Sequence, residues 1–215
     1  MKLDASPNFM KKFGDVWRSA RNDKLKESLM PTPWYIDLSK YLIDWKTRQK
    51  VHLISWLKKQ IDSELVKSIV LENEWDNIED LDKRMFAVFR WVCNRFTYKT
   101  DKEIWGTDEH WSTIEESLDI KDGRGDCEDG AVAMFVLARA CGIPEDRIKI
   151  VTGNVVGGGH CWIVYTANDG AMYCMDWCYW KTFTLFPNRK SLYEQSNYFN
   201  GQKIWFGVTD KRGYS

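Results

Sequence analysis

Apolar residues in the middle of the chain follow helical spacing and predict two helices. Between Asp80 and Phe96 they recur on one helical face, which predicts an amphipathic helix over this segment. From Ala131 to Cys141 only Arg139 is charged, so this second helix is apolar nearly all round and should be buried at the centre of the fold. The packing surface of the first helix consists of Met85, Phe86, Val88, Phe89 and Val92.

Polar residues and a glycine mark the two ends of the central helix. Asp126 is a suitable N-cap, and Asp129 stands three residues later, which approximates a capping box. Gly142 fits the position after the helix, and Pro144 prevents its continuation. These signals place Cys127 in the first turn, where backbone N–H groups and the helix dipole stabilise an anion.

The pattern after the central helix predicts three strands joined by two turns. The first strand covers Ile148 to Val156, and the second covers His160 to Ala167. A flexible turn of three glycines, residues 157–159, separates them. The third strand covers Ala171 to Trp177 and follows a turn at Asn168-Asp169-Gly170.

The length of the second turn determines which side chains share a face. A two-residue loop at Asp169-Gly170 would place His160 and Asp176 on opposite faces of the sheet. A three-residue loop with Gly170 in the left-handed conformation places Trp162 opposite Asp176, with His160 as the diagonal neighbour of Asp176 on the same face. The Asn-Asp-Gly sequence favours the three-residue loop.

The first hundred residues are predicted to be mostly helical. A basic helix from Lys11 to Met30 ends at Pro31-Thr32-Pro33, and Ile36 to Ile69 should form two helices or one long bent helix. We therefore divide the chain into an N-terminal helical extension, residues 1–80, and a second domain, residues 81–215. The 12 tryptophans favour packing of the extension onto that domain, with a docking surface for a protein partner as the alternative.

Charge and hydropathy exclude several classes of partner. The chain holds 31 basic and 31 acidic residues, for a formal net charge of +0, so it has no overall field that would hold a nucleic acid or an anionic membrane. The first residues lack the apolar core of a signal peptide, and no run reaches the length of a membrane span. We expect a cytoplasmic protein, with a virion as the alternative location.

Cys127, His160 and Asp176 have the residue types of a thiol catalytic site. A cysteine at a helix start, followed by a histidine and an aspartate on successive strands, can supply a nucleophile, a base and a group that orients the base. A helix N-terminus beside a histidine lowers the pKa of a thiol from ~8.5 into the range ~3.5–7.5. We therefore expect an activated Cys127 thiolate that performs acyl transfer.

The six cysteines also raise the alternatives of disulfides and a metal site. The lack of an export signal favours reduced thiols over disulfides. His160, Cys161, Cys174 and Cys178 include both common types of zinc ligand. However, neighbouring strand residues such as His160 and Cys161 point to opposite faces, which makes joint ligation awkward. We expect neither a metal nor a cofactor.

Four parts of the sequence together resemble the transglutaminase-like superfamily, most closely its bacterial cysteine-peptidase branch. They are Gly125-Asp126-Cys127-Glu128-Asp129, Leu137-Ala138-Arg139-Ala140-Cys141-Gly142-Ile143-Pro144, His160-Cys161-Trp162 and Asp176, within a resemblance that runs from about Phe86 to Tyr179. The resemblance implies an α+β, papain-like core in which a central helix bearing the nucleophile packs on an antiparallel sheet. It also implies that Cys127 is the nucleophile, His160 the general base and acid, and Asp176 the orienting carboxylate.

The segment from Trp105 to Ser112 resembles the aromatic segment that precedes the family's cysteine. In several relatives a tryptophan or tyrosine there helps the N–H of the cysteine to bind the oxyanion. Trp111 is the first candidate for this donor and Trp105 the second, because an indole N–H only donates. Two positions depart from the family's pattern: Cys161 stands where alanine is common, and Trp177-Cys178 stands where Pro-Thr is common.

The resemblance implies a thiol-dependent acyl-transfer enzyme that acts on amide bonds of a protein or peptide, most simply a cysteine peptidase or amidase. Transfer of the acyl group to water gives hydrolysis, whereas transfer to a second amine gives protein crosslinking by transamidation. A non-catalytic structural or virion protein that retains the fold is a further alternative. The intact Cys127, His160 and Asp176 favour an enzyme.

Overall fold

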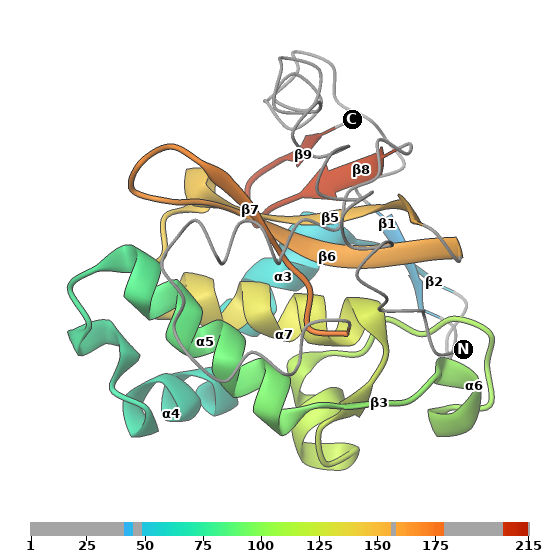
Figure 1. Ribbon diagram of the computed structural model, residues 1–215. Helices are drawn as coiled ribbons and strands as arrows, with labels where there is room; N and C mark the ends of the chain where they lie inside the picture. The colour runs from blue at the N-terminus through green and yellow to red at the C-terminus, as the bar shows by residue number, and fades with distance from the viewer. Residues whose placement is uncertain (1–40, 45–48, 156–157, 179–203, 215) are drawn as a thin grey trace, which may run out of the picture.

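A buried helix, α7 (Cys127–Ala140), lies against a five-stranded antiparallel sheet in this computed structural model (Figure 1). The structure describes residues 41–44, 49–155, 158–178 and 204–214. Helices α3 (Leu53–Ile61), α4 (Glu64–Glu72) and α5 (Leu81–Arg95) also pack against α7. The expected α+β fold, with a central helix on an antiparallel sheet, is confirmed.

The sheet has the strand order β7-β6-β5-β8-β9, and each neighbouring pair is antiparallel. Its strands are β5 (Ile148–Val155), β6 (Gly158–Thr166), β7 (Met172–Met175), β8 (Ile204–Val208) and β9 (Gly213–Tyr214). The three strands expected from the sequence are β5, β6 and β7. The prediction that residues 157–159 form the turn is wrong for two of them. Gly158 and Gly159 pair with β5 and so belong to β6.

Strands β6 and β7 pair in the register of a three-residue loop. Ile163 lies opposite Met175, and the N–H of Ala167 donates to the carbonyl of Ala171 at 2.8 Å. Gly170 has a φ of 78°, the left-handed conformation that such a loop needs at its last position. The predicted loop is therefore confirmed.

Both predicted ends of the central helix are confirmed. Asp126 is the N-cap, and its N–H donates to the carboxylate of Asp129 at 3.3 Å. Gly142 follows the helix with a φ of 92°, and the N–H of Ile143 donates to the carbonyl of Ala138 at 2.9 Å. These are the features of a Schellman motif, which satisfies the last carbonyl groups of the helix.

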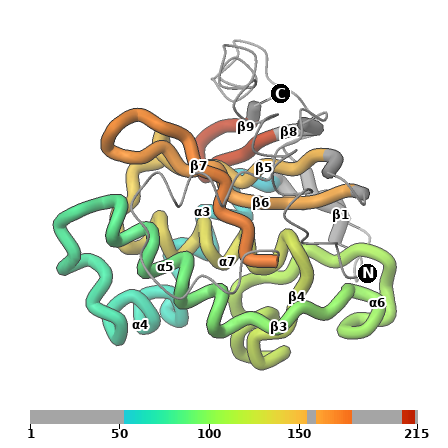
Figure 2. Tube along the Cα trace, in the orientation of Figure 1, coloured from blue at the N-terminus to red at the C-terminus, as the bar shows by residue number. Residues whose placement is uncertain are grey.

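The apolar surface of α7 is used for packing. Every residue from Glu128 to Ala138 is buried, and the helix packs against β5 and β6 of the sheet and against α3, α4 and α5 (Figure 2). In the described part of the chain, no helix is long and apolar enough to cross a membrane. The predicted helix at residues 80–96 is α5, which begins after its N-cap Asp80 and ends before Phe96.

Short elements lead the chain into α7. Strand β3 (Thr97–Tyr98) pairs in parallel with β4 (Arg124–Gly125), which ends two residues before Cys127. This pairing fixes where α7 begins. The remaining short helices are η2 (Trp75–Asn77), α6 (Asp101–Ile104), the π-helix η3 (Glu116–Ile120) and η4 (Glu145–Arg147).

One ion pair holds the β8–β9 hairpin to the far end of α7, and a second holds it to η4. Arg139, in the last turn of the helix, lies 2.8 Å from Asp210, and Arg212 lies 2.8 Å from Glu145 of η4. Asp210 and Arg212 both belong to the turn between β8 and β9. The C-terminal strands are therefore attached to the helix that bears Cys127.

The N-terminal region differs from the expected helix or helices over Ile36 to Ile69. Strands β1 (Tyr41–Asp44) and β2 (Gln49–His52) form an antiparallel hairpin, and helix begins only at Leu53. Both strands contain β-favouring residues, and their pairing supplies backbone hydrogen bonds that a short isolated helix would hold only marginally. The predicted helix from Lys11 to Met30 lies outside the described residues, and the domain boundary between residues 80 and 81 stays a prediction.

Replacing Gly130 with alanine should destabilise the fold, because α7 touches the segment after β7 here. A Cβ at Gly130 would overlap the buried indole of Trp177, which donates to the carbonyl of Cys127 at 3.2 Å. Overpacking costs about 1–3 kcal/mol, and loss of the indole hydrogen bond adds ~1 kcal/mol. Together they exceed the ~1 kcal/mol that alanine gains over glycine in a helix. Chemical denaturation should show the net loss.

Gly170→Asn is the matched control for this substitution. Nothing lies within 4 Å of a Cβ at Gly170, and asparagine tolerates its left-handed backbone. A loss of stability in Gly170→Asn as large as in Gly130→Ala would contradict the close contact between α7 and Trp177.

Candidate active site

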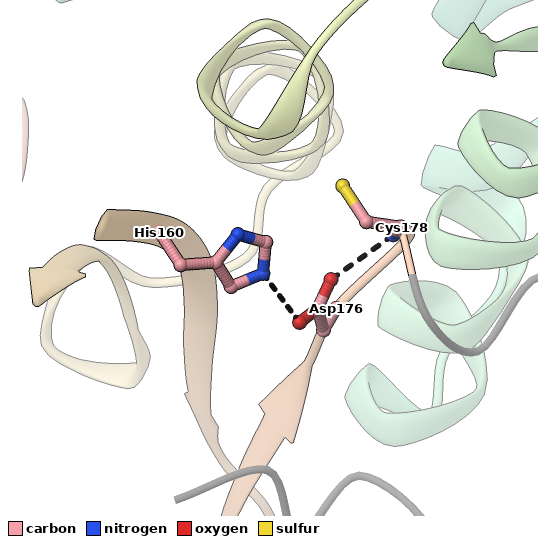
Figure 3. Close-up of side chains that lie close together, drawn as sticks. All are labelled: His160, Asp176 and Cys178. Carbon is pink, nitrogen blue, oxygen red and sulfur yellow. Dashed lines mark hydrogen bonds and ion pairs between the residues drawn. The ribbon is translucent and has the colours of Figure 1, made fainter. Parts of the chain in front are cut away.

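His160 of β6 meets Asp176, the residue that follows β7. His160 Nε2 lies 2.6 Å from Asp176 Oδ2, and both side chains are buried (Figure 3). The other carboxylate oxygen, Oδ1, accepts the N–H of Cys178 at 3.0 Å. An ionised carboxylate in this position fixes the orientation of the imidazole and keeps its hydrogen on Nε2.

Cys127 occupies the first turn of α7, as the sequence predicted, and is half-buried. Its Sγ lies 3.1 Å from Oε2 of Glu128. The indole of Trp177 donates to the carbonyl of Cys127, and Trp177 is the residue directly after Asp176. This hydrogen bond joins the end of the sheet that carries His160 and Asp176 to the helix turn that carries Cys127.

Burial changes the expected chemistry of the Cys127 thiol. Desolvation, followed by the negative charge of Glu128, raises the pKa of Cys127 well above its usual value. The expectation of a lowered pKa is therefore wrong for this structure, because the loss of hydration outweighs the effect of the helix N-terminus. At neutral pH the resting thiol therefore keeps its proton.

Five carboxyl groups gather at the start of α7. Desolvation is the largest cause of a raised pKa in each of these groups. One of them is Asp126, and repulsion from its charge raises the pKa of each of the other four carboxyl groups further. The pKa of Asp101 rises to about 7. Glu109 is exposed as a residue, yet its carboxyl group is desolvated beside the others. The five residues are Asp101, Glu109, Asp126, Glu128 and Asp129.

Two of these carboxylates anchor the segment that precedes α7. Asp101 accepts the backbone N–H of His110, and Asp129 accepts the backbone N–H of Ser112 at 2.8 Å. The sequence placed Asp129 near Cys127 through helix spacing. No sequence signal indicated that Asp101 lies near Cys127, since this depends on the path of the chain between α6 and α7.

Several of these carboxyl groups are close enough to share one cation. Oxygen atoms of Asp101, Glu109 and Glu128 lie within 4.8 Å of one another, as do those of Asp101, Asp126 and Asp129. Oxygen donors of this kind suit Ca²⁺ or Mg²⁺. A bound divalent cation would also favour the ionised form of each carboxyl group.

A separate set of donors has nitrogen and sulfur as well as oxygen. Ligand atoms of His160, Asp176 and Cys178 lie within 4.8 Å of one another. Cys161 and Cys174, the other members of the zinc set considered from the sequence, belong to none of the donor groups found among the described residues. The sequence spacing therefore identified two of the three residues that the fold brings together, and missed Asp176 as a potential ligand.

The aromatic segment before α7 makes its own set of contacts. Trp111 Nε1 donates to Glu109 Oε1 at 2.9 Å. The ring of Trp105 contacts that of His110 in a tilted arrangement with centroids 4.3 Å apart, and Lys121 Nζ lies 4.1 Å from the centroid of the Trp105 ring. The assignment of either tryptophan as an oxyanion donor stays a prediction.

Comparison with known protein families agrees with this fold. A family model described as the transglutaminase-like superfamily matches residues 71–179, just over half of the chain. The chain belongs to the transglutaminase-like superfamily. The matched segment contains α7 and strands β5 to β7, so Cys127, His160 and Asp176 all lie within it.

Solved structures of LapG from Legionella pneumophila are also similar to the chain. The EGTA-treated form has 18% sequence identity and a TM-score of 0.47, over 74% of this chain and 84% of that one. The calcium-bound form has 19% identity and a TM-score of 0.42, over 75% of this chain and 86% of that one. No curated protein matches the chain. The family assignment rests on the family model alone.

The raised pKa of Asp101 predicts that stability depends on pH. Its pKa is about 7 in the fold, against ~3.9 in an unfolded chain, so the folded state binds this proton more tightly. The stability that the group contributes is complete below pH ~4 and is lost as the pH rises through about 7. The free energy of unfolding should fall across this range, and Asp101→Asn, which keeps an acceptor for His110, should reduce the slope.

Denaturant unfolding at a series of pH values measures this slope. Asp119→Asn is the control, because Asp119 is an exposed carboxylate outside the cluster, and this variant should keep the wild-type slope. Equal slopes in the wild type and in Asp101→Asn would show that Asp101 does not hold a proton in the folded state near neutral pH.

Proposed function

We propose that this protein is a thiol-dependent acyl-transfer enzyme, a cysteine peptidase or amidase with Cys127, His160 and Asp176 as its catalytic residues. The observation that carries the proposal is the buried 2.6 Å contact between His160 and Asp176. It lies at the end of a sheet that packs on the helix bearing Cys127. Membership of the transglutaminase-like superfamily supports the same class of chemistry.

In the first half of the proposed reaction, the Cys127 sulfur attacks the carbonyl carbon of an amide as its proton passes to Nδ1 of His160. Asp176 keeps the hydrogen on Nε2 and stabilises the imidazolium that forms. Return of the proton to the amide nitrogen breaks the carbon–nitrogen bond and releases the amine. The product of this half-reaction is a thioester on Cys127.

In the second half, water attacks the thioester while His160 accepts a proton from it. The acid leaves, and the proton returns to the sulfur, so the thiol is restored. If a second amine reaches the thioester before water does, the same steps give transamidation. Hydrolysis of a protein or peptide is our main proposal, and crosslinking is the alternative that product analysis separates from it.

The raised pKa of Cys127 supports proton transfer during the attack rather than before it. A thiol that keeps its proton at rest is a weak nucleophile, so the base must act in the transition state. In the resting site the sulfur lies beside Glu128 at 3.1 Å. The thiol hydrogen must leave this carboxyl group before His160 can accept it, and we infer that a bound substrate causes that change.

The oxyanion of the tetrahedral intermediate needs two donors in this proposal. The backbone N–H of Cys127 supplies one, because it belongs to the first turn of α7 and has no partner within the helix. Trp111 remains the first candidate for the second and Trp105 the alternative. Since Trp111 Nε1 donates to Glu109, its indole would have to exchange this carboxylate for the oxyanion.

The proposal predicts cleavage of peptides through a thioester that a nucleophile can trap. Incubation of the protein with a peptide library should give new C-termini, and added hydroxylamine should convert them to hydroxamates at the same sites. Asp176→Asn should lower turnover by about 10²–10⁴-fold, since the imidazole loses its preferred tautomer. Mass spectrometry of the products measures both effects.

Two cysteine variants make this test specific. Cys127→Ala should abolish cleavage and hydroxamate formation. Cys141→Ala should retain both, because Cys141 is buried at the other end of α7. Cleavage that survives in Cys127→Ala would refute the nucleophile assignment, and a folded wild type that gives neither product would favour the non-catalytic alternative.

Trp111→Phe tests the indole donor. Phenylalanine keeps most of the apolar bulk and removes the N–H, so turnover should fall by roughly tenfold to a thousandfold if the indole binds the oxyanion. Alkylation of Cys127 by iodoacetamide forms no oxyanion and should change little. Trp105→Phe is the matched comparison, and unchanged turnover in both variants would exclude an indole donor.

A further inference from the structure

Cys178 places a second sulfur beside the His160–Asp176 contact, and the proposed acyl transfer does not use it. Figure 3 shows the three side chains gathered together, and their ligand atoms lie within 4.8 Å of one another. The N–H of Cys178 donates to Asp176 Oδ1 at 3.0 Å, which fixes the backbone that carries this sulfur. The fold therefore presents one nitrogen, one oxygen and one sulfur donor at a single point.

We propose that His160, Asp176 and Cys178 form a binding site for Zn²⁺, and that the bound ion holds the proposed enzyme inactive. Zinc is bound in proteins by imidazole nitrogen, thiolate sulfur and carboxylate oxygen, and three protein ligands leave one position for water. The metal site rests on the geometry alone. The inactivation also rests on the proposed function.

Binding requires only small movements of side chains. Zinc–ligand bonds of about 2.0–2.3 Å in a tetrahedron separate the ligand atoms by roughly 3.3–3.8 Å. The contact between His160 and Asp176 is 2.6 Å and would open. All three separations are below 4.8 Å, so each lies within about 1 Å of this range or already inside or below it. Rotations about side-chain bonds of the three residues can supply these changes.

Protons balance in a simple way when the ion binds. Bonds form from zinc to the ring nitrogen Nε2, a carboxylate oxygen and the sulfur. Cys178 releases its thiol proton to solvent, as a zinc-bound cysteine does. His160 stays neutral, because its hydrogen moves from Nε2 to Nδ1, and Asp176 enters as the carboxylate.

This change removes the general base without any contact between zinc and Cys127. Nδ1 of His160 accepts the thiol proton in the proposed reaction, and in the zinc-bound state that nitrogen already carries a hydrogen. The protonated Cys127 thiol could then not pass its proton to His160. Zinc should therefore stop turnover reversibly, and a chelator should restore it.

The carboxyl groups at the start of α7 are not expected to compete for this ion. Two of the donor groups there offer oxygen only, which suits Ca²⁺ or Mg²⁺, and the third, Asp126, Cys127 and Glu128, adds a sulfur but no imidazole nitrogen. Sulfur and imidazole nitrogen together select zinc and similar transition metals. An excess of Ca²⁺ should leave zinc binding at His160, Asp176 and Cys178 unchanged.

Titration of the full chain with Co²⁺, a spectroscopic substitute for zinc, tests the site directly. The wild type should bind one ion with tetrahedral visible absorption and a thiolate-to-cobalt charge-transfer band, and Zn²⁺ should displace it. Cys178→Ser should lose the charge-transfer band. Asp176→Asn should weaken Zn²⁺ binding by at least about 10–100-fold, the loss expected even from an outer partner of a ligand.

Cys174→Ser and Cys127→Ser are the matched controls, and both should keep the charge-transfer band. Cys174 is buried on β7 four residues before Cys178, a spacing that two zinc ligands can have. If Cys174→Ser keeps the band, Cys174 is not a ligand, as the observed geometry predicts. A band that survives in Cys178→Ser, or equal Zn²⁺ affinity in the wild type and Cys178→Ser, would overturn the site.

Peptide cleavage measured with and without Zn²⁺ tests the inactivation separately. For each protein the cleavage rate is expressed as a fraction of its own rate without zinc. The Zn²⁺ concentration that halves this rate should be far higher for Cys178→Ser than for the wild type. Equal sensitivity in the two proteins would overturn the regulatory part. If no preparation cleaves peptides, the proposed function fails, while the cobalt titration still decides the metal site.

Discussion

The pairing register of β6 and β7 is the constraint on which the candidate site depends. Side chains alternate between the faces of a sheet, so a shift of one residue would move Asp176 away from His160. Gly170 sets this register, because its φ of 78° allows the three-residue loop. The same register brings Trp177 against Gly130 and the carbonyl of Cys127. One turn therefore positions the histidine, its carboxylate and the contact to the helix that bears Cys127.

The packing that positions these residues also determines the pKa of the Cys127 thiol. A helix N-terminus favours a nearby anion by ~0.3–1 kcal/mol, and up to ~2 kcal/mol when partly buried. Burial can shift a pKa by ~3–5 units, and each unit corresponds to ~1.4 kcal/mol. For Cys127 the second effect is larger, and Glu128 adds to it. In the proposed reaction His160 therefore acts as a base during the attack, rather than as the partner of a standing thiolate.

Local signals predicted those parts of the fold that local interactions stabilise. Asp126 and Gly142 mark the ends of α7, and Asn168-Asp169-Gly170 indicates the loop that aligns β6 with β7. The β1–β2 hairpin was missed because residues 41–52 were predicted as helix together with the segment that begins at Leu53 and is helical. The approach of Asp101 to α7 depends on the path of a loop, and the pKa of Cys127 depends on packing from several elements.

The crowding of carboxyl groups connects the stability of the fold to the chemistry of the thiol. Asp101 loses its proton as the pH rises through about 7, which adds a negative charge beside Asp126. Negative charge at the start of α7 raises the pKa of Cys127, as Glu128 and Asp126 already do. Proton loss from this cluster should therefore weaken the fold and make the thiol harder to ionise at the same time. The proposed reaction requires Nδ1 of His160 to accept a proton from this thiol, and zinc at Cys178 would remove that ability.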